Sequence, residues 1–149
     1  MRRLRAISRA ACLALAAGAT GSLAGAQDYA QRLPEGYPLP LFEWAVTTEL
    51  ASRIAYACDA HVLDRGRVDS LLAQAVTGAF GTDEAYDEWR GESMSNADHL
   101  SVFELVRAEV ARRGMLDGYD LGDRAVLCAY GDRQVAESSP AGWLIGAGG

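Results

Sequence analysis

Apolar side chains recur every three or four residues through much of the chain, and this spacing predicts α-helices. The first predicted helix runs from Phe42 to about Val62, and the second covers Arg67–Ala79. The apolar stripe of the first helix consists of Trp44, Thr47, Leu50, Ile54, Cys58 and His61. The stripe of the second consists of Val68, Leu71, Leu72, Ala75 and Val76.

Helix-capping residues divide the rest of the chain into three further helices. Thr82 is a good N-cap for a short helix, Ser95 begins a longer one, and Arg112-Arg113-Gly114 is expected to stop it. Asp120 is the expected N-cap of a final helix that ends near residues 138–140. The longer helix carries the stripe Leu100, Phe103, Val106, Val110 and Ala111, and the final helix carries Leu121, Ala125, Cys128, Ala129 and Val135.

The predicted fold is all-α, because no run of residues alternates between apolar and polar positions as a half-buried strand would. We expect a bundle of four or five helices over residues 42–149, with an extended lead-in over residues 27–41. Pro34, Pro38 and Pro40 exclude a helix or a central strand from that lead-in. The aromatic residues expected to fill the core are Trp44, Trp89 and Phe103.

Residues 1–26 have the features of a secretory signal peptide. Four arginines precede a short apolar block, Ala10–Ala17, and the small residues Ala24-Gly25-Ala26 suit a signal peptidase. We expect cleavage after Ala26 and a periplasmic or secreted product, with Sec and twin-arginine export both open. A mitochondrial transit peptide is the alternative. Because the apolar block is too short to cross about 30 Å of hydrocarbon, we expect no stable membrane span after signal removal.

The charge balance becomes more acidic once that segment is removed. The whole chain has 14 basic and 20 acidic residues, and every basic residue is an arginine. Without residues 1–26, 10 arginines remain against 20 acidic side chains, so the net charge falls from −6 to −10. Such a chain repels phosphate backbones, and we therefore expect no nucleic-acid partner.

Two cysteines remain after signal cleavage, Cys58 and Cys128. An even cysteine count in an oxidising compartment predicts one disulfide, here between the first and the last predicted helix. The bond would close a loop of 70 residues, and a crosslink of this span stabilises a fold by about 4 kcal/mol. The alternative is a pair of buried free thiols.

The C-terminal part of the chain contains a distinctive motif. It comprises Cys128-Ala129-Tyr130-Gly131, Val135-Ala136, Ser138-Ser139 and Gly142-Trp143-Leu144-Ile145. This motif resembles the end of a family of small exported alphaproteobacterial proteins of unknown function, in which an early and a final helix each carry a cysteine. Cys58 and Cys128 occupy the matching places. The likeness covers about residues 45–145, with departures at Pro140 and at 91–96, and it implies a helical exported protein without an assigned activity.

The two histidines offer an alternative chemistry. Cys58 and His61 lie three residues apart on the predicted helix, and His99 and Cys128 would complete a tetrahedral Cys2His2 zinc site. That site and the disulfide exclude each other, because zinc needs both cysteines as thiolates and a disulfide leaves neither. His61 with Asp64 three residues later is also a candidate general base, whereas His99 is expected to face solvent.

These features favour an exported, non-catalytic interaction or structural protein that binds a protein or peptide through an apolar groove or an acidic face, without a cofactor. The sequence has no G-x-S-x-G nucleophile elbow, and Ser138-Ser139 are expected to satisfy helix-terminal carbonyls. One alternative is a periplasmic holdase that opens under acid or stress as its carboxylates are protonated. A second alternative is a His61-dependent enzyme or a zinc-binding protein.

Overall fold

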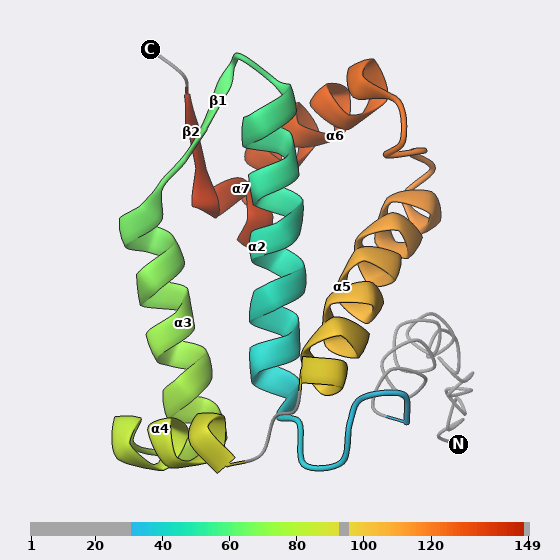
Figure 1. Cartoon of the computed structure of the whole chain (residues 1–149). Helices are drawn as coiled ribbons and strands as arrows, with labels where there is room; N and C mark the ends of the chain where they lie inside the picture. The colour runs from blue at the N-terminus through green and yellow to red at the C-terminus, as the bar shows by residue number, and fades with distance from the viewer. Residues whose placement is uncertain (1–30, 93–95, 148–149) are drawn as a thin grey trace, which may run out of the picture. The chain divides into compact units, whose positions relative to one another are not determined.

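The computed structural model describes residues 31–92 and 96–147 (Figure 1). The predicted signal peptide, the start of the lead-in and Ser95 lie outside the described residues. The chain from Arg32 onward forms one compact unit. The described part of this unit is predominantly helical, which confirms the predicted fold class.

Six helices and two short strands make up the described part of the chain. The long helix α2 is central, because α3, α5, α6 and α7 all contact it; α3 and α5 run along opposite sides of it in Figure 1. Helix α4 packs against α3. The helices are α2 (Leu39–Ala57), α3 (Arg65–Phe80), α4 (Asp83–Glu92), α5 (Asn96–Leu116), α6 (Arg124–Ala136) and α7 (Pro140–Leu144), and the strands are β1 (His61–Leu63) and β2 (Ile145–Ala147).

Helix α2 begins inside the segment predicted to be an extended lead-in. Pro38 is its N-cap, with an extended backbone, and Pro40 lies in its first turn. Proline is tolerated there because the first N–H groups of a helix have no intrahelical partner. The non-helical lead-in therefore ends at Pro38, and the helical region starts three residues before the predicted Phe42.

Helix α2 also ends earlier than predicted, at Ala57. Cys58 is its C-cap and has extended backbone angles, φ −123° and ψ 111°. His61 does not continue the helix but lies in strand β1, which pairs antiparallel with β2. A strand of three residues is too short to leave an alternating pattern in the sequence, which is why periodicity missed it. The paired positions are His61 with Ala147, Val62 with Gly146, and Leu63 with Ile145.

Helix α3 begins two residues before and ends one residue after the predicted range Arg67–Ala79, and helix α4 follows the predicted cap Thr82. Asp64 Oδ1 accepts the N–H of Arg67 at 3.1 Å, and α3 ends before Gly81, whose φ of 78° suits glycine. Thr82 Oγ1 accepts a backbone N–H of the first turn of α4 at 3.3 Å. Helix α3 packs against α2, with Val76 as its fully buried residue.

Helix α5 passes through the predicted stop at Arg112-Arg113-Gly114 and ends at Leu116. Its end is closed by Gly118, which has a φ of 85°, whereas Gly114 lies within the helix and packs against the side chain of Leu121. The buried face is also rotated from the prediction. It consists of Val102, Leu105, Val106, Glu109 and Val110, whereas Leu100, Phe103 and Ala111 are exposed.

Helix α6 is capped by Asp123 and not by the predicted Asp120. Asp123 Oδ1 accepts the N–H groups of Ala125 and Val126 at 2.8 and 3.0 Å. Asp120 instead accepts the N–H of Gly122 within the preceding turn. The buried face of α6 is Leu127, Tyr130, Gly131 and Gln134, whereas Ala125, Ala129 and Val135 of the predicted stripe are exposed.

The two serines after α6 connect it to α7. Ser138 has a φ of 52°, which turns the chain, and Ser139 Oγ accepts the N–H of Gly142 at 3.0 Å. Ser139 therefore caps the start of α7. The backbone N–H groups of Ser138 and Ser139 also donate to the carbonyls of Val135 and Gln134 at the end of α6, at 3.1 and 3.0 Å, so these serines satisfy helix-terminal carbonyls as predicted. Pro140 begins α7 rather than interrupting a helix. Gly142 lies directly against the backbone of Gln134, where a Cβ would overlap the carbonyl group.

Candidate functional site

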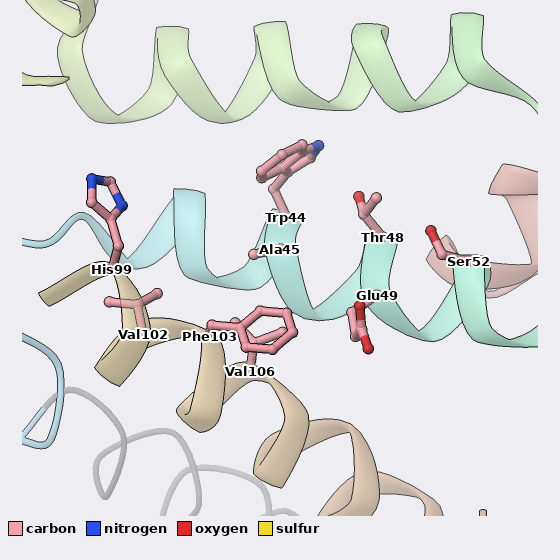
Figure 2. A pocket seen from close by; sticks show the side chains of 9 residues that line it. All are labelled: Trp44, Ala45, Thr48, Glu49, Ser52, His99, Val102, Phe103 and Val106. Atoms are coloured by element: carbon pink, nitrogen blue, oxygen red, sulfur yellow. The ribbon is translucent and has the colours of Figure 1, made fainter. Parts of the chain in front are cut away.

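A groove with a volume of about 250 Å³ opens between α2 and α5 (Figure 2). Each helix contributes residues spaced three or four apart, so each presents one face to the groove. We call this surface the α2–α5 groove. It is lined by Trp44, Ala45, Thr48, Glu49 and Ser52 of α2 and by His99, Val102, Phe103 and Val106 of α5.

Two polar groups of the α2–α5 groove are unused within the described part of the chain. Thr48 Oγ1 is a buried oxygen without a hydrogen-bond partner, whereas the neighbouring Thr47 Oγ1 donates to Glu43 O at 2.8 Å. Glu49 has neither a hydrogen bond nor an ion pair to another described residue. A buried hydroxyl left unpaired costs free energy, so a ligand that pairs with it gains affinity.

The aromatic residues of the groove are only partly covered. Trp44 Nε1 donates to Val68 O of α3 at 3.4 Å, and the indole is half-buried. Phe103 is 52% exposed, and the guanidinium of Arg107 lies 5.7 Å from its ring centroid. The prediction that Phe103 fills the core was therefore wrong. Leu100, one turn earlier on α5, is also exposed, so apolar surface extends beyond the groove.

Trp89, the third predicted core residue, is half-buried in a different place. It packs in an aromatic cluster at the junction of α3 and α4, 5.3 Å from the ring of Phe80 and 5.5 Å from the ring of Tyr37. Trp89 is thus part of the scaffold and does not line the α2–α5 groove.

A buried carboxylate with two arginines connects the helices on either side of the groove. Glu109 is fully buried, and its carboxylate accepts from Arg112 Nε at 2.7 Å and from Arg113 Nε at 2.6 Å. Arg113 Nη2 also donates to both carboxylate oxygens of Glu43 in α2, at 2.7 and 2.8 Å. Hydrogen bonds between charged groups are stronger than those between neutral groups, so this network fixes α5 against α2.

This network predicts a pH dependence of stability. Burial raises the pKa of Glu109, although the hydrogen bond and the charge of Arg113 oppose that rise. A carboxyl whose pKa is raised on folding contributes stability that is fully present below its unfolded pKa and is lost as the pH rises through the folded pKa. We therefore expect the free energy of unfolding of the wild type to fall relative to that of Glu109→Gln as the pH is raised from about 4 toward neutrality.

Urea denaturation at a series of pH values measures this difference. Glu104→Gln is the matched control, because Glu104 is an exposed glutamate of the same helix. The control should follow the wild-type profile. Parallel profiles for the wild type and Glu109→Gln would contradict the role of burial.

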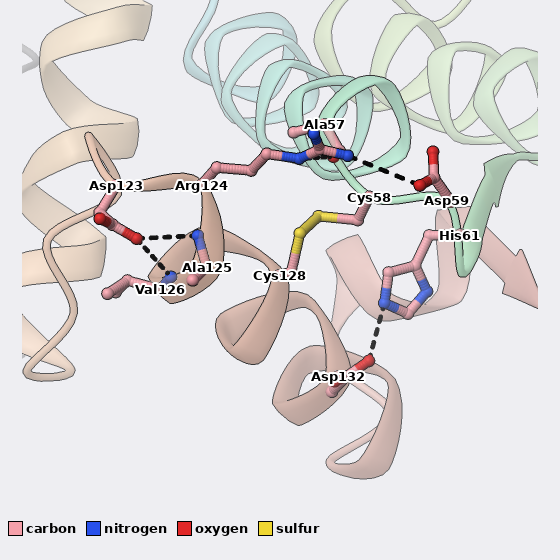
Figure 3. Close-up of a disulfide and its surroundings, with 10 residues drawn as sticks. All are labelled: Ala57, Cys58, Asp59, His61, Asp123, Arg124, Ala125, Val126, Cys128 and Asp132. Atoms are coloured by element: carbon pink, nitrogen blue, oxygen red, sulfur yellow. Dashed lines mark hydrogen bonds and ion pairs between the residues drawn. A yellow bond between two sulfur atoms is a disulfide. The ribbon is translucent and has the colours of Figure 1, made fainter.

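The predicted disulfide joins Cys58, at the end of α2, to Cys128 in α6 (Figure 3). The two Cα atoms are 5.6 Å apart, and the cysteines are separated by 70 residues in the sequence. A second link lies beside it, because Arg124 Nε donates to Ala57 O at 2.6 Å. The end of α2 is therefore attached to α6 both covalently and by a hydrogen bond.

His61 lies close to the disulfide, but with a different partner from the one predicted. Its side chain is 7% exposed, and Nε2 lies 2.9 Å from Asp132 Oδ1 in α6. Asp64, the predicted partner, caps α3 instead. The ring also packs over Gly131, because a Cβ there would lie 3.3 Å from Nε2. The pair anchors strand β1 to α6, and His61 does not line the α2–α5 groove.

The structure does not bring the four residues of the alternative zinc site together. Cys58 and Cys128 are bonded to each other, and His99, near the start of α5, is exposed as predicted and lines the α2–α5 groove. Cys58 lies at the opposite end of α2 from that part of the groove. Over the described residues, no group of three or more His, Cys, Asp or Glu side chains is arranged to hold a metal ion.

The structure thus defines a mostly helical protein with one disulfide and an open groove beside its central helix. Comparisons of the chain with family models, with curated proteins and with solved structures find no match. None of the described helices combines the length and the apolar composition needed to cross a membrane.

Proposed function

We propose that this chain is an exported, non-catalytic interaction protein that binds a segment of a protein or peptide in the α2–α5 groove. The observation that carries the proposal is the buried, unpartnered hydroxyl of Thr48 in a groove lined mainly by apolar side chains. Buried polar groups in proteins are paired in the great majority of cases, so an unpaired one in an open groove points to a binding partner.

The groove favours one large apolar side chain next to a basic residue. Its volume of about 250 Å³ lies below the range of about 300–1,000 Å³ that is usual for small-molecule sites, so a side chain fits better than a cofactor. Trp44 and Phe103 supply apolar contact area, and Glu49 supplies a carboxylate with no partner among the described residues. A peptide with phenylalanine or leucine followed by arginine matches these three groups.

Export is supported by the features of residues 1–26 and by the bonded cysteines, because structural disulfides persist in oxidising compartments. Intact mass of the secreted protein tests this part of the proposal. A chain that begins at Gln27 and is two hydrogens lighter than the reduced form is expected. Retention of Met1 in the exported protein would contradict it.

The alternatives have less support in the geometry. A general base needs access to substrate, and the ring of His61 is buried with Nε2 already paired to Asp132. A holdase that opens in acid needs protonation to destabilise the fold. At Glu109 protonation has the opposite effect on stability. Burial raises the pKa of this carboxyl, so folding favours its protonated form and acid stabilises the fold at this residue.

Thr48→Val gives the sharpest test of binding in the groove. Valine has nearly the shape of threonine and lacks the unpaired hydroxyl, so we expect the free energy of unfolding to rise by about 1 kcal/mol. A labelled synthetic peptide, Gly-Ser-Gly-Phe-Arg-Gly-Ser-Gly, should nevertheless bind this variant about tenfold more weakly than the wild type, since each tenfold corresponds to about 1.4 kcal/mol. Fluorescence anisotropy and urea denaturation measure the two quantities.

Matched controls separate binding from folding. Thr47→Val removes a hydroxyl that is already paired outside the groove, so it should leave peptide affinity unchanged. Peptides with Ala for Phe, or Glu for Arg, should bind more weakly than the parent peptide. Equal affinity of all three peptides, or an unchanged affinity in Thr48→Val, would refute binding in this groove.

A further inference from the structure

A second pocket, with a volume of about 540 Å³, lies between the C-terminal half of α2 and the start of α6. Two of its lining side chains are arginines, although the chain as a whole has a net charge of −6. We call it the arginine pocket. It is lined by Arg53, Tyr56, Ala57, Leu121, Gly122, Arg124 and Leu127.

Arg53 is held in place without a carboxylate. Its Nη2 donates to Leu121 O at 3.1 Å, which fixes the guanidinium at the pocket. No described carboxylate lies within ion-pair distance of Arg53. A guanidinium has five N–H donors, so one hydrogen bond to a carbonyl leaves most of the donors of Arg53 and its whole charge available to an anion.

Arg124 is positioned in the same way from the other side of the pocket. Its Nε donates to Ala57 O at 2.6 Å, and its Nη2 lies 3.6 Å from Asp59 Oδ2 (Figure 3). The side chain of Asp59 is fully exposed, so this ion pair is weak and is easily exchanged for another anion. The two guanidiniums are therefore both oriented by backbone carbonyls.

The nearby acidic residues are engaged elsewhere. Asp120 Oδ1 accepts the N–H of Gly122, and Asp123 Oδ1 accepts two N–H groups of the first turn of α6. Neither carboxylate is within ion-pair distance of Arg53 or Arg124. Tyr56, which is 96% exposed, lines the same pocket and adds a phenolic donor.

We propose that the arginine pocket binds an oxyanion, a carboxylate or a phosphate, between Arg53 and Arg124. Two oriented guanidiniums match the paired oxygens of such an anion, and this arrangement forms strong charge-assisted hydrogen bonds. The inference is independent of the α2–α5 groove, because the two sets of lining residues do not overlap.

Titration of the purified protein with sodium acetate and, separately, with inorganic phosphate tests this site. Ionic strength is held constant with chloride, and the amide resonance of Gly122 is followed by NMR. A saturable shift with either anion is expected; acetate identifies a carboxylate ligand, and phosphate identifies an inorganic or organic phosphate. Shifts that stay linear with both anions would overturn the proposal.

Substitution of Arg53 tests whether the arginines of the pocket bind the anion. Arg53→Met should weaken binding about tenfold or more, because it removes the charged donors. Arg65→Met is the matched control, since Arg65 is exposed on α3 and lies outside the pocket, and it should leave affinity unchanged. Should Arg53→Met fail to fold, Arg53→Lys keeps the charge and loses the planar fork, so it should still weaken binding. Wild-type affinity in the folded Arg53 variant would reject the site.

Discussion

Replacement of both Cys58 and Cys128 by alanine should lower the free energy of unfolding by about 4 kcal/mol, as measured by urea denaturation. The disulfide closes a loop of 70 residues and so restricts the conformations of the unfolded chain. In the chain-entropy model, removing a crosslink of this span raises the entropy of the unfolded state and lowers the free energy of unfolding by about this amount. Since a domain is typically stable by only about 5–15 kcal/mol, this loss is a large fraction of the total.

A reductant provides the control for this experiment. Dithiothreitol should destabilise the wild type by a similar amount and should not change the double variant, which has no disulfide to reduce. A double variant as stable as the oxidised wild type would show that the crosslink does not restrain the unfolded chain.

The second large effect is expected for Gly142→Ala, which should destabilise the protein by about 3 kcal/mol. A Cβ at this position would overlap the backbone carbonyl of Gln134 and lie 2.7 Å from the N of Val135. Backbone atoms of a packed helix cannot rotate away as a side chain can, so α7 would have to move off α6. That movement would also break the bonds from Ser139 N–H to Gln134 O and from Ser139 Oγ to Gln134 Oε1.

Gly78→Ala is the matched control, because Gly78 lies in α3 with no atom within 4 Å of a Cβ built there. Alanine in an open helical position should stabilise the protein by about 0.5–1 kcal/mol. The same substitution should therefore have opposite signs at the two sites, and thermal unfolding measures both. Destabilisation by both variants to the same extent would contradict the role of close packing.

The sequence predicts local structure well where a single residue determines it. Thr82 caps its helix as expected, and Leu50 and Ile54 are buried as their spacing predicts. The errors occur where the structure depends on contacts with residues outside the local segment. Helix α5 continues past Gly114 because that residue packs against Leu121, which lies beyond the end of the helix, and helical spacing does not show this contact.

The candidate sites were less predictable than the helices. The cysteine pair follows from a count, but the pairing of His61 with Asp132 spans 71 residues and depends on how β1 meets α6. The α2–α5 groove depends on which face of α5 is turned inward. The periodicity places Phe103 inside, whereas the structure leaves it half-exposed and buries Val102 and Leu105 instead. Rotation of a helix about its axis is a tertiary property, and spacing alone does not determine it.

The pairing of β1 with β2 has a consequence for how the chain reaches its native state. Its partner residues are more than 80 positions apart, so β1 can pair only after residues 145–147 have been synthesised. Contacts of such long range form slowly. Because Cys128 precedes residues 145–147 in the chain, the covalent link between α2 and α6 can form before the two strands meet.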